Sequence, residues 1–441
     1  SGYPLAWWAS DRDATRCSGL PVDRVGTDRC RMRVCVVGSG GREHALAHVL
    51  GRSHDVVVTP GNPGIPGSAP VPPTEVDADL TVIGPEVPLV GGLADRLRAD
   101  GRLVFGPGAD GARLEGSKAW MKEVLVEAGV PTAAHGTFDD EAAALAFLAG
   151  MGDLFVVKTD GLAAGKGVVV TTNRAEAVDT VRSYLSGAAF GDAGRTVVIE
   201  EGLTGPELSV LAVCDGTTAV ALAPAQDFKR VGDGDAGPNT GGMGAYSPVP
   251  VATNAVVDDL VAGAVQPTLA ALRGRGIDYR GVLYCGLMLT PDGPKVLEYN
   301  VRFGDPETQV VLPRLTSDLG YLLATAAAGS LKEPPTFDDG AAVTVVCATE
   351  GYPTCPRTGD PIDGLEAASA IDGVTIFSAG VADGGDGGLV TAGGRVLSLT
   401  GRGRTIAEAR GRAYDAVAEL AWSGMQFRRD IAANPTGAGS D

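Results

Sequence analysis

Lysine is scarce in this chain, and two of its lysines stand where an ammonium group needs a negative partner. Seven of the 36 basic residues are lysine, so arginine supplies most of the general positive charge. Lys158 follows the apolar residues 155–157 of a predicted strand, and a buried ammonium is unfavourable unless it meets an anion. Substrate phosphate is its favoured partner, with a structural carboxylate as the alternative. Lys118 lies in the first turn of a predicted helix, where the dipole disfavours a cation. It therefore either faces an anion or is a solvated surface lysine.

Polar side chains alternate along a predicted strand that begins at Lys295. Because successive side chains of a strand point to opposite faces, Glu298, Asn300 and Arg302 share one face. Carboxylate and amide oxygens suit a Mg²⁺ ion that is shared with nucleotide phosphates. Arg302 could clamp a carboxylate or phosphate through two parallel hydrogen bonds. The alternative is a solvated strand face, which the further polar residues at 304–308 make less attractive.

Two glycine-rich segments are candidates for binding phosphate. Residues 38–41 (Gly-Ser-Gly-Gly) follow a strand and open a helix, so backbone N–H groups and the helix dipole could hold an anion there. A dinucleotide fingerprint would have a third glycine where Glu43 stands. A phosphate-bearing substrate is therefore favoured over a nicotinamide or flavin, and over a tight packing turn. Residues 160–167 differ from a P-loop, because Gly167 replaces the Ser or Thr and a strand follows. Such a hairpin suits closure over a triphosphate through Lys166, with a mobile turn as the alternative.

Two other groups of polar residues indicate a function less specifically. Glu200 and Glu201 end an apolar strand and Glu207 begins the next, an arrangement that could bind adenine through backbone groups and ribose through a carboxylate. Spacing alone leaves this a hypothesis. His44 and His48 have a metal-binding spacing on one helix, but no third ligand is near in sequence, so a packing face is favoured.

Composition narrows the class of protein. The chain has 441 residues and a formal net charge of −18, and a surface this negative repels phosphate backbones and anionic lipid. Neither nucleic acid nor a membrane is therefore an expected partner, and no apolar run approaches the ~18–20 residues of a membrane span. The seven cysteines are scattered and lack a C-x-x-C spacing, which favours a reducing cytoplasm over a disulfide framework or a zinc site.

The order of predicted elements indicates several domains. Strands alternate with helices over residues 33–106, which predicts a parallel sheet, whereas strands after residue 150 follow one another as antiparallel pairs. Residues 231–244 are polar and glycine-rich and are expected to form a long loop. A helix over 254–273 and two strands lead to a proline-rich boundary at 333–335. The last unit mixes strands with one helix that begins at Thr405.

Taken together, these segments resemble the ATP-grasp superfamily and, within it, the phosphoribosylamine–glycine ligase family. The resemblance runs from Met32 to about Asp430. Two motifs are highly specific to this family, Pro-Asn-Thr-Gly-Gly-Met-Gly-Ala-Tyr-Ser-Pro at 238–248 and Arg-Phe-Gly-Asp-Pro-Glu-Thr-Gln at 302–309. Further matching segments are 36–46, 84–86, 114–118, 158–167 and 226–232.

The resemblance implies a fold and a division of the chain. The expected fold is a multidomain α/β and α+β protein, with a Rossmann-like N-terminal sheet, a central ATP-grasp domain with a mobile lid, and a small C-terminal α+β domain. The implied divisions are a disordered extension over 1–31, the N-terminal domain over 32–134, the lid over 135–205, the ATP-grasp core over 206–335, the C-terminal domain over 336–430 and a tail over 431–441.

The resemblance also implies a reaction and the residues for ATP. ATP phosphorylates the carboxylate of glycine, and the amine of 5-phosphoribosylamine attacks the glycyl phosphate to give glycinamide ribonucleotide, ADP and phosphate in purine biosynthesis. Catalysis would rest mainly on charge neutralisation and alignment. The implied ATP and metal contacts are Lys118 and Lys158 on the phosphates, Lys166 in the closing hairpin, the backbone of Glu200, Glu201 and Leu203 on adenine, Glu207 on ribose, and Glu298 and Asn300 on Mg²⁺ or Mn²⁺.

The remaining implied residues bind the other two substrates. Glycine and the acyl phosphate would be oriented by Arg302, Asp227, Lys229, Asn239, Thr240 and Gly241. The 5-phosphate of phosphoribosylamine would be held by Gly38, Gly40, Gly41 and Arg42, with Glu86 near its ribose. The protein is expected to act in the cytoplasm as a monomer or weak dimer.

Three features depart from the family pattern. Phe228 stands where a histidine is usual, Pro206 stands where a carboxylate often precedes Glu207, and residues 61–80 are too few for a full helix. Other functions considered are a ligase for a different carboxylate and amine, a nucleotide-dependent oxidoreductase built on the Gly38 turn, and a binding protein without activity. The 238–248 motif disfavours the first of these functions. The missing third glycine disfavours the second, and the complete set of phosphate lysines disfavours the third.

Overall fold

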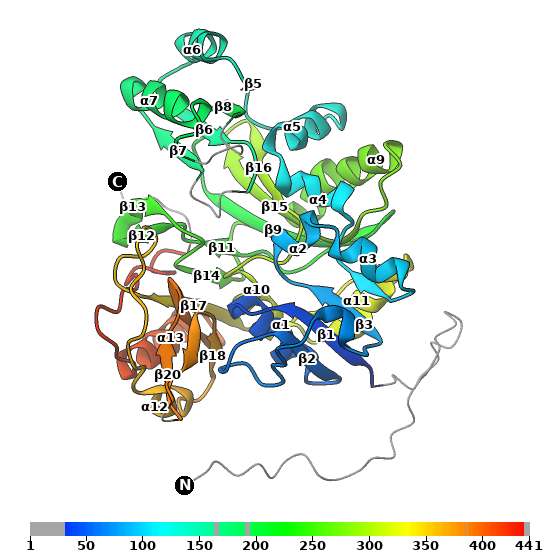
Figure 1. Cartoon of the computed structure of the whole chain (residues 1–441), viewed down its shortest axis with the longest axis vertical. Helices are drawn as coiled ribbons and strands as arrows, with labels where there is room; N and C mark the ends of the chain where they lie inside the picture. Colours follow the sequence, from blue (N-terminus) through cyan, green and yellow to red (C-terminus); the bar gives the residue numbers. More distant parts are fainter. Residues whose placement is uncertain (1–30, 163–166, 190–194, 386, 436–441) are drawn as a thin grey trace.

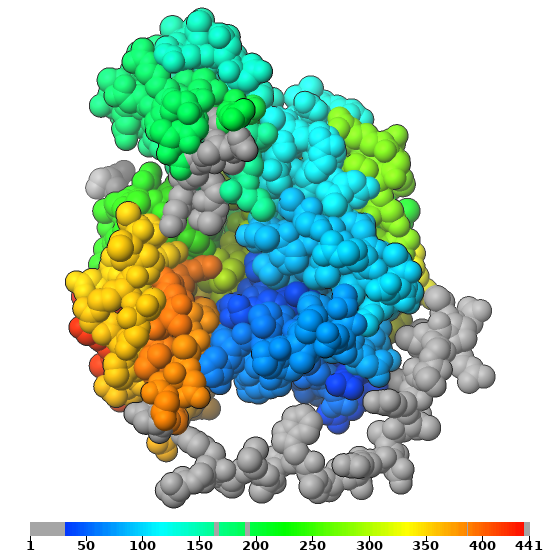
Figure 2. Space-filling model, viewed as in Figure 1, coloured from blue at the N-terminus to red at the C-terminus, as the bar shows by residue number. Residues whose placement is uncertain are grey.

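The computed structural model describes residues 31–162, 167–189, 195–385 and 387–435. Figure 1 shows the N-terminal and C-terminal parts side by side, with residues 135–201 projecting at the top of the view. The space-filling view in Figure 2 shows the same projection as a separate lobe above the rest. Residues 1–30 of the expected extension, residues 436–441 of the expected tail, and Lys166 lie outside the described residues.

The N-terminal domain is built on a parallel sheet, as predicted. Its strand order is β2-β1-β3-β4, and every residue of β1 after Arg33 is buried. Between β2 and β3 the described chain forms only a 3-10 turn, Pro73–Glu75, so the expectation that no full helix fits there is confirmed. The elements are β1 (Arg33–Gly38), α1 (Gly41–Leu50), β2 (Asp55–Pro60), β3 (Leu80–Ile83), α2 (Glu86–Val90), α3 (Leu93–Ala99), β4 (Val104–Phe105) and α4 (Ala109–Gly116).

The lid is an antiparallel sheet of order β5-β8-β6-β7 with its own apolar core. The predicted hairpin is confirmed, because β6 pairs antiparallel with β7. Phe155, Val157, Ile199 and the buried residues of two helices make up the lid core. The elements are β5 (His135–Phe138), α6 (Glu141–Ala149), β6 (Phe155–Thr159), β7 (Val168–Thr171), α7 (Arg174–Leu185) and β8 (Val197–Glu201).

The ATP-grasp core is an antiparallel sheet of order β10-β9-β15-β16. Helix α5 (Lys118–Glu127) has Lys118 in its first turn, as predicted, and is capped by Ser117, whose hydroxyl accepts from the Trp120 N–H. A continuous helix follows the sheet, made of α8 (Asn254–Leu260), a π turn (Val261–Val265) and α9 (Gln266–Gly274). The strands are β9 (Glu207–Asp215), β10 (Ala219–Ala221), β15 (Arg280–Thr290) and β16 (Gly293–Asn300).

The continuous helix over residues 254–274 is strongly apolar. Asn254–Gly274 has a mean hydropathy of 1.3 and is long and apolar enough to cross a membrane by length and composition. Its residues Val257, Leu260, Leu269 and Leu272 are nevertheless buried in the main apolar core, which is how the core helix of a globular domain passes the same test.

Residues 231–244, which we expected to form a long loop, contain a separate hairpin and end where strand β14 of the C-terminal sheet begins, so that expectation is wrong. Residues 230–239 form a hairpin, β12 (Arg230–Gly232) with β13 (Ala236–Asn239), and β14 pairs with β17 almost a hundred residues later. The five-stranded order is β11-β14-β17-β21-β18. The strands are β11 (Gln226–Asp227), β14 (Gly244–Ser247), β17 (Ala341–Ala348), β18 (Val374–Ser378) and β21 (Arg395–Gly403), with a side hairpin of β19 (Val381–Asp383) and β20 (Leu389–Thr391).

The helices of the last two domains complete the list. They are α10 (Thr308–Val311), α11 (Leu319–Ala327), α12 (Leu365–Ser369) and α13 (Ile406–Glu419). The expected tail begins too early, since Ile431 and Ala432 are buried in the main core.

Helix α1 joins the N-terminal and C-terminal domains, which accounts for its two histidines. His44 and His48 both pack edge-on against Phe377 of β18. The Ser378 N–H donates to His44 Nδ1 over 2.8 Å. Burial lowers the pKa of His44 to about 4, so the ring is neutral at physiological pH. The packing function that the sequence favoured over a metal site is therefore observed.

Candidate active site

A buried carboxylate flanked by two lysines lies where the lid meets the ATP-grasp core. Lys158 Nζ is 2.8 Å from Glu200 Oε1, and Lys122 Nζ is 2.9 Å from Glu200 Oε2. Lys158 also donates to the carbonyl oxygen of Leu297 on β16, over 3.1 Å. The predicted burial of Lys158 is confirmed, and the Glu200 carboxylate is a negative partner for its ammonium. The ion pairs tie the lid strands β6 and β8 to helix α5.

Burial disfavours the charged forms of Lys122 and Glu200, whereas the ion pairs between the three side chains favour them. Burial lowers the pKa of Lys122 to about 8, against the pull of Glu200. Burial tends to raise the pKa of Glu200, but Lys158 and Lys122 outweigh it and hold that pKa below its ordinary value. Sequence reasoning missed Lys122, although the scarcity of lysine and its place one helical turn after Lys118 were available signals.

Lys118 lies beside the same group at the start of α5. Its ammonium donates to the carbonyl oxygen of Gly161 over 2.9 Å, where the lid hairpin begins. Burial lowers the pKa of Lys118, while the carboxylate of Glu298 opposes that shift and Lys158 adds to it. Lys118 therefore faces negative charge, and its field reaches both Lys158 and Glu298.

Glu298 and Asn300 share one face of β16, as the alternation predicts. Tyr299 between them is buried on the other side, with its hydroxyl 2.8 Å from that of Thr268 in α9. A β-bulge between Gly286 and Leu287 of β15 shifts the register just before Glu298. Among the described residues, no side chain or backbone group donates a hydrogen bond to the Glu298 carboxylate. Its oxygens are thus available to a cation.

The side-chain oxygens of Glu298 and Asn300 suit a hard divalent ion whose remaining coordination positions are filled by a bound ligand. Asn300 Oδ1 accepts from Arg302 over 3.3 Å and so points to the same side as the Arg302 guanidinium. No group of three or more His, Cys, Asp or Glu side chains in the described part of the chain could hold a metal by itself. Glu298 and Asn300 therefore suit a Mg²⁺ or Mn²⁺ ion whose remaining ligands are phosphate oxygens and water.

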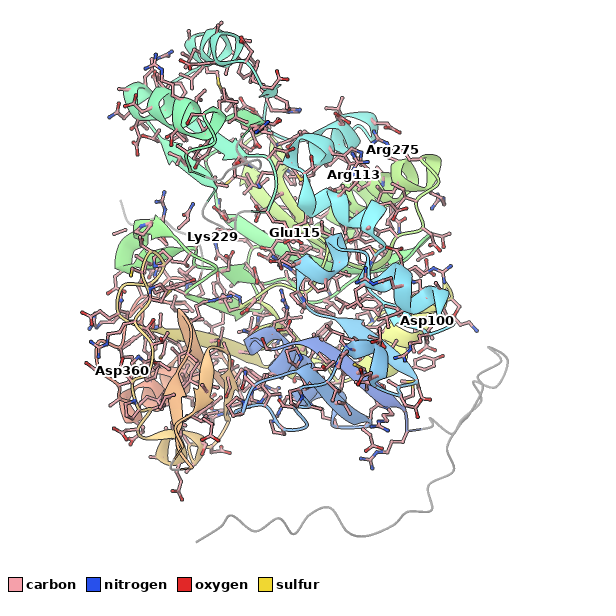
Figure 3. All side chains as sticks on the ribbon, viewed as in Figure 1. Asp100, Arg113, Glu115, Lys229, Arg275 and Asp360 are labelled. Atoms are coloured by element: carbon pink, nitrogen blue, oxygen red, sulfur yellow. The ribbon has the colours of Figure 1, made fainter. Side chains whose placement is uncertain are left out.

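Arg302 links β16 to the N-terminal domain through two carboxylates. It lies 2.8 Å from Glu115 Oε1 and 3.3 Å from Glu86 Oε2. Burial opposes its charge, but Glu115 and Glu86 raise the pKa of Arg302. Figure 3 shows Glu115 and Lys229 near the middle of the view, between the lid and the two lower domains. The structure thus brings Glu86 and Arg302 together, and it adds Glu115, to which the sequence pattern assigned no function.

A second charged group lies on β9 and β11. Lys229 forms ion pairs with Glu207 and, over 3.1 Å, with Asp227. Burial opposes the charge of Lys229, yet Asp227 and Glu207 raise its pKa well above the ordinary value. Burial raises the pKa of Asp227 despite Lys229. These three predicted site residues are in direct contact.

Glu307 borders this group and was missed by sequence reasoning. Its Oε1 accepts from Tyr284 over 2.9 Å and from Ser209 over 3.3 Å. Burial, followed by the charge of Asp227, raises the pKa of Glu307 to about 7. Its place inside the 302–309 motif was the one available signal.

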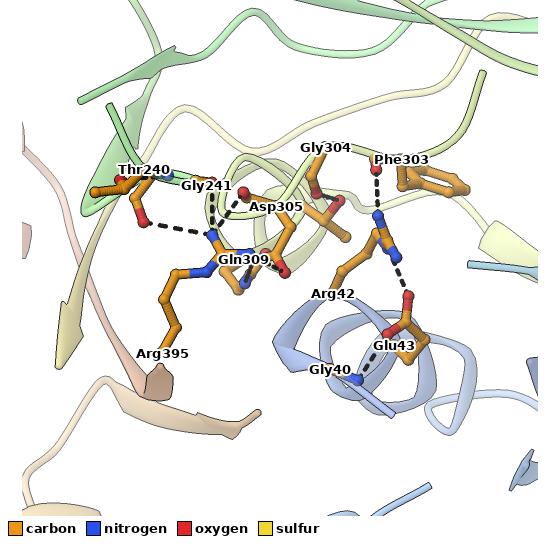
Figure 4. Close-up of polar contacts among 12 residues, drawn as sticks. Gly40, Arg42, Glu43, Thr240, Gly241, Phe303, Gly304, Asp305, Gln309 and Arg395 are labelled. Carbon is orange, nitrogen blue, oxygen red and sulfur yellow. Dashed lines mark hydrogen bonds and ion pairs between the residues drawn. The ribbon is translucent and has the colours of Figure 1, made fainter. Parts of the chain in front are cut away.

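The glycine-rich turn before α1 is closed by a carboxylate. Glu43 Oε2 accepts from the Gly40 N–H over 2.7 Å, and its other oxygen pairs with Arg42 (Figure 4). Gly38 has φ +135°, and a Cβ there would lie 2.5 Å from the Glu43 side chain, so this position requires glycine. The N–H groups of Gly41 and Arg42, in the first turn, have no acceptor within the helix and remain suited to an anion.

The remaining predicted residues lie around these groups. Asn239 ends β13, and the Thr240 hydroxyl donates to the Lys229 carbonyl over 2.8 Å. Glu201 ends β8, where its carboxylate accepts from the Ala134 N–H over 3.0 Å and pairs with Lys295 over 3.2 Å. Leu203 follows β8 in the connection to β9 and is half-buried.

The two family departures near the site have structural explanations. Phe228 packs against Tyr246, with ring centroids 6.3 Å apart, and lies under the Arg428 guanidinium at 4.9 Å. A packing residue therefore occupies the position where the family usually has a histidine. Pro206 accepts from the Leu289 N–H over 2.9 Å and so continues the pairing of β9 with β15.

The chain combines a parallel N-terminal sheet with a smaller antiparallel sheet and an antiparallel core sheet. Buried lysines lie where the two antiparallel sheets meet, next to the Glu298–Asn300 face. This arrangement is that of an ATP-grasp ligase. A biotin carboxylase structure from Campylobacter jejuni, determined as an ATP complex, shares this fold with a TM-score of 0.66 at 14% identity over 90% of this chain and 93% of that one.

The chain matches the phosphoribosylglycinamide synthetase N domain over residues 32–115, the ATP-grasp (A) domain over 116–308 and the C domain over 342–434. It is 49% identical over 427 residues to a phosphoribosylamine–glycine ligase of Streptomyces coelicolor, covering 92% of this chain and all of that one. A crystal structure of the Thermotoga maritima phosphoribosylamine–glycine ligase is similar with a TM-score of 0.79 and 36% identity, over 90% of this chain and 100% of that one. The chain therefore belongs to the phosphoribosylglycinamide synthetase family.

Proposed function

We propose that this ATP-grasp ligase joins glycine to 5-phosphoribosylamine and forms glycinamide ribonucleotide, ADP and phosphate. The observation that carries the proposal is that Lys158 donates to the Leu297 carbonyl next to Glu298, and that Lys118 interacts electrostatically with both Lys158 and Glu298. Such a set can neutralise a polyphosphate that is transferring its terminal phosphoryl group.

ATP binds between the lid sheet and the core sheet in this proposal. Lys118 and Lys158 contact its phosphates, and the hairpin that carries Lys166 closes over them. Backbone groups of Glu200, Glu201 and Leu203 bind adenine. Because Lys122 and Lys158 hold the Glu200 side chain from both sides, the Glu200 backbone is in a fixed position to do so.

Glu207 contacts both the nucleotide and Lys229 in this proposal. It accepts from the ribose hydroxyls, and it also pairs with Lys229. This pairing links the nucleotide site to the glycine site, because Lys229 contacts Asp227 as well.

Glu298 and Asn300 hold the divalent ion, Mg²⁺ or Mn²⁺. When bound, such an ion neutralises phosphate oxygens and draws electron density from the phosphorus under attack. The chain itself supplies alignment, since Arg302 keeps Asn300 in place and is in turn held by Glu86 and Glu115.

Glycine and phosphoribosylamine bind next to the phosphates of the nucleotide, toward the N-terminal domain. Arg302, Asp227, Lys229 and residues 239–241 orient glycine and the acyl phosphate, whereas Gly38, Gly40, Gly41 and Arg42 hold the 5-phosphate, with Glu86 near the ribose. A carboxylate oxygen of glycine attacks the terminal phosphorus of ATP, and the P–O bond to ADP breaks to leave glycyl phosphate. The amine of phosphoribosylamine then attacks the acyl carbon, the C–N bond forms, the C–O bond to phosphate breaks, and the amine nitrogen loses one proton.

We further propose that the protein acts in the cytoplasm as a monomer or weak dimer, with no nucleic acid or membrane partner. The described cysteines support a reducing compartment, because Cys35, Cys214, Cys285, Cys347 and Cys355 are all free thiols.

The function is tested by measuring phosphate release with ATP, Mg²⁺, glycine and freshly generated phosphoribosylamine, and by omitting each in turn. Release is expected only when all four are present. If another amino acid replaces glycine with a higher kcat/KM, the chain is an ATP-grasp ligase for a different carboxylate and the proposal is wrong.

A further inference from the structure

The C-terminal domain reaches the proposed substrate site through Arg395, the first residue of β21. Its guanidinium donates to the carbonyl oxygens of Gly241 over 2.6 Å and Asp305 over 2.9 Å, and it pairs with the Asp305 carboxylate over 2.9 Å (Figure 4). A longer bond of 3.3 Å goes to the Gly242 carbonyl. These acceptors belong to two segments that lie more than sixty residues apart in sequence. One side chain therefore sets their relative position.

A second side chain of the same domain holds the other side of the same peptide. The Gly241 N–H donates to the Tyr352 hydroxyl over 3.1 Å. Gly242 has φ +108°, and a Cβ there would lie 2.4 Å from Pro306 Cδ. Residues 241–242 thus pack directly on the turn at 305–306, and this segment has no room to shift without moving that turn.

Asp305 connects this cluster to the turn before α1. Its Oδ1 accepts from Gln309 over 2.7 Å, and its Oδ2 would lie 3.8 Å from a Cβ at Gly40. Arg42 donates to the Phe303 carbonyl over 3.3 Å, two residues before Asp305. Asp305 therefore lies next to the turn assigned to the 5-phosphate, and Arg395 joins it to the segment assigned to glycine.

We propose that Arg395 is a positioning residue through which the C-terminal domain aligns the glycine segment with the phosphate-binding turn. This inference rests on the proposed function, which assigns those two segments to glycine and phosphoribosylamine. Within the described residues, the hydrogen bonds of the Arg395 guanidinium go to Gly241, Gly242 and Asp305, and none goes to Lys118, Lys158 or Glu298. Loss of Arg395 therefore impairs binding of the two acceptor substrates and leaves ATP binding intact.

The test compares Arg395→Met with Arg402→Met, a matched change on the same strand. Arg402 pairs with Asp338, away from the site. For Arg395→Met, kcat/KM for phosphoribosylamine is expected to fall by about 100-fold, the cost of a misplacement of about 1 Å. The affinity of both variants for a non-hydrolysable ATP analogue is expected to stay within about twofold of the unaltered protein, as for substitutions remote from a contact.

Two further measurements keep the inference open to refutation. Tyr352→Phe removes one oxygen and is expected to raise the KM for phosphoribosylamine about threefold to tenfold, the equivalent of one hydrogen bond, without changing the melting temperature. Hydrogen exchange over residues 239–243 and 303–309 is expected to accelerate in Arg395→Met and not in Arg402→Met.

The outcomes separate the two proposals. An unaltered protein that fails to turn over glycine and phosphoribosylamine overturns the proposed function, while the exchange measurement still decides whether Arg395 positions these segments. Unchanged KM values and unchanged exchange in Arg395→Met overturn the role of Arg395. A parallel loss of ATP-analogue affinity in Arg395→Met also overturns it, because the effect would then be general.

Discussion

Replacing Glu200 by glutamine removes the carboxylate that two buried ammonium groups share. Lys122 and Lys158 lie 2.9 and 2.8 Å from its two oxygens, and all three side chains are at least 93% buried. Breaking a buried ion pair while its partners remain charged costs about 3–5 kcal/mol, because uncompensated charge is left away from water. The free energy of unfolding of Glu200→Gln is expected to fall by this amount at pH 7.

The assay is urea unfolding followed by circular dichroism, with Glu141→Gln as the matched control in the lid. Arg182 pairs with Glu141 over 3.0 Å, but both side chains are about half exposed. An exposed pair contributes about 0.2–1 kcal/mol, so the control is expected to lose no more than that. Adding Lys122→Met to Glu200→Gln is expected to recover part of the loss, since it removes one of the two stranded charges.

Alkaline pH gives an independent check on the same group. Burial lowers the pKa of Lys122 from 10.5 to about 8, so between these values the unfolded chain binds the extra proton. Stability contributed by this group therefore rises as pH increases from about 8 to 10.5. If Glu200→Gln costs no more than Glu141→Gln at pH 7, the two ammonium groups are hydrated or neutral and the description of this cluster is wrong.

Four further predictions follow from the site and its supports. Glu298→Gln is expected to lower kcat by at least ~100-fold, the scale of disturbing a metal ligand, with the unfolding free energy almost unchanged; Asp292→Asn in the same hairpin is the control, and near-normal turnover of Glu298→Gln would contradict the metal assignment. Arg302→Lys is expected to lower kcat/KM for glycine, because an ammonium cannot contact Glu86 and Glu115 together as the guanidinium does; steady-state kinetics with glycine varied would show it, and equal kinetics would refute it. Lowering the pH from 6.5 to about 4 is expected to cost about 3 kcal/mol through His44, whose folded pKa lies about 2.5 units below the unfolded value; urea unfolding of His44→Gln should lack this part of the pH dependence, and an identical dependence would count against it. Gly242→Ala is expected to destabilise by more than ~1 kcal/mol at its φ of +108°, while Gly263→Ala, where a Cβ meets nothing within 4 Å, should be neutral or stabilising; equal melting temperatures would show that residues 241–242 have room to move.

Local patterns predicted the features that depend on neighbours in sequence. The shared face of Glu298 and Asn300 follows from the period of a strand, the start of α5 follows from the capping hydroxyl of Ser117, and the β6–β7 hairpin follows from two short apolar runs around glycines. Each of these depends on backbone geometry within one short stretch of chain, the longest being Phe155–Thr171 of the hairpin. The family resemblance added the expected reaction and the assignment of residues to its substrates.

Residues 230–247 show where such patterns are insufficient. The glycines and polar side chains of 231–244 are typical of a loop, but residues 230–239 form a hairpin and Gly244–Ser247 pairs as a strand with residues 342–345 of β17. Formation of β14 depends on pairing with β17, almost a hundred residues further along the chain. The residues around 240 therefore cannot indicate this strand by themselves.

What the sequence determined by itself is the elements with strong local patterns, the shared face of Glu298 and Asn300 and the family to which the chain belongs, since these depend on local geometry and on motifs. What only the tertiary structure decided is which charges meet: Lys122 with Glu200, Arg302 with Glu115, and Arg395 with Asp305. The stability and protonation of a buried charge depend on groups within a few ångströms, whatever their separation along the chain, so these pairs became visible only when the domains were packed together.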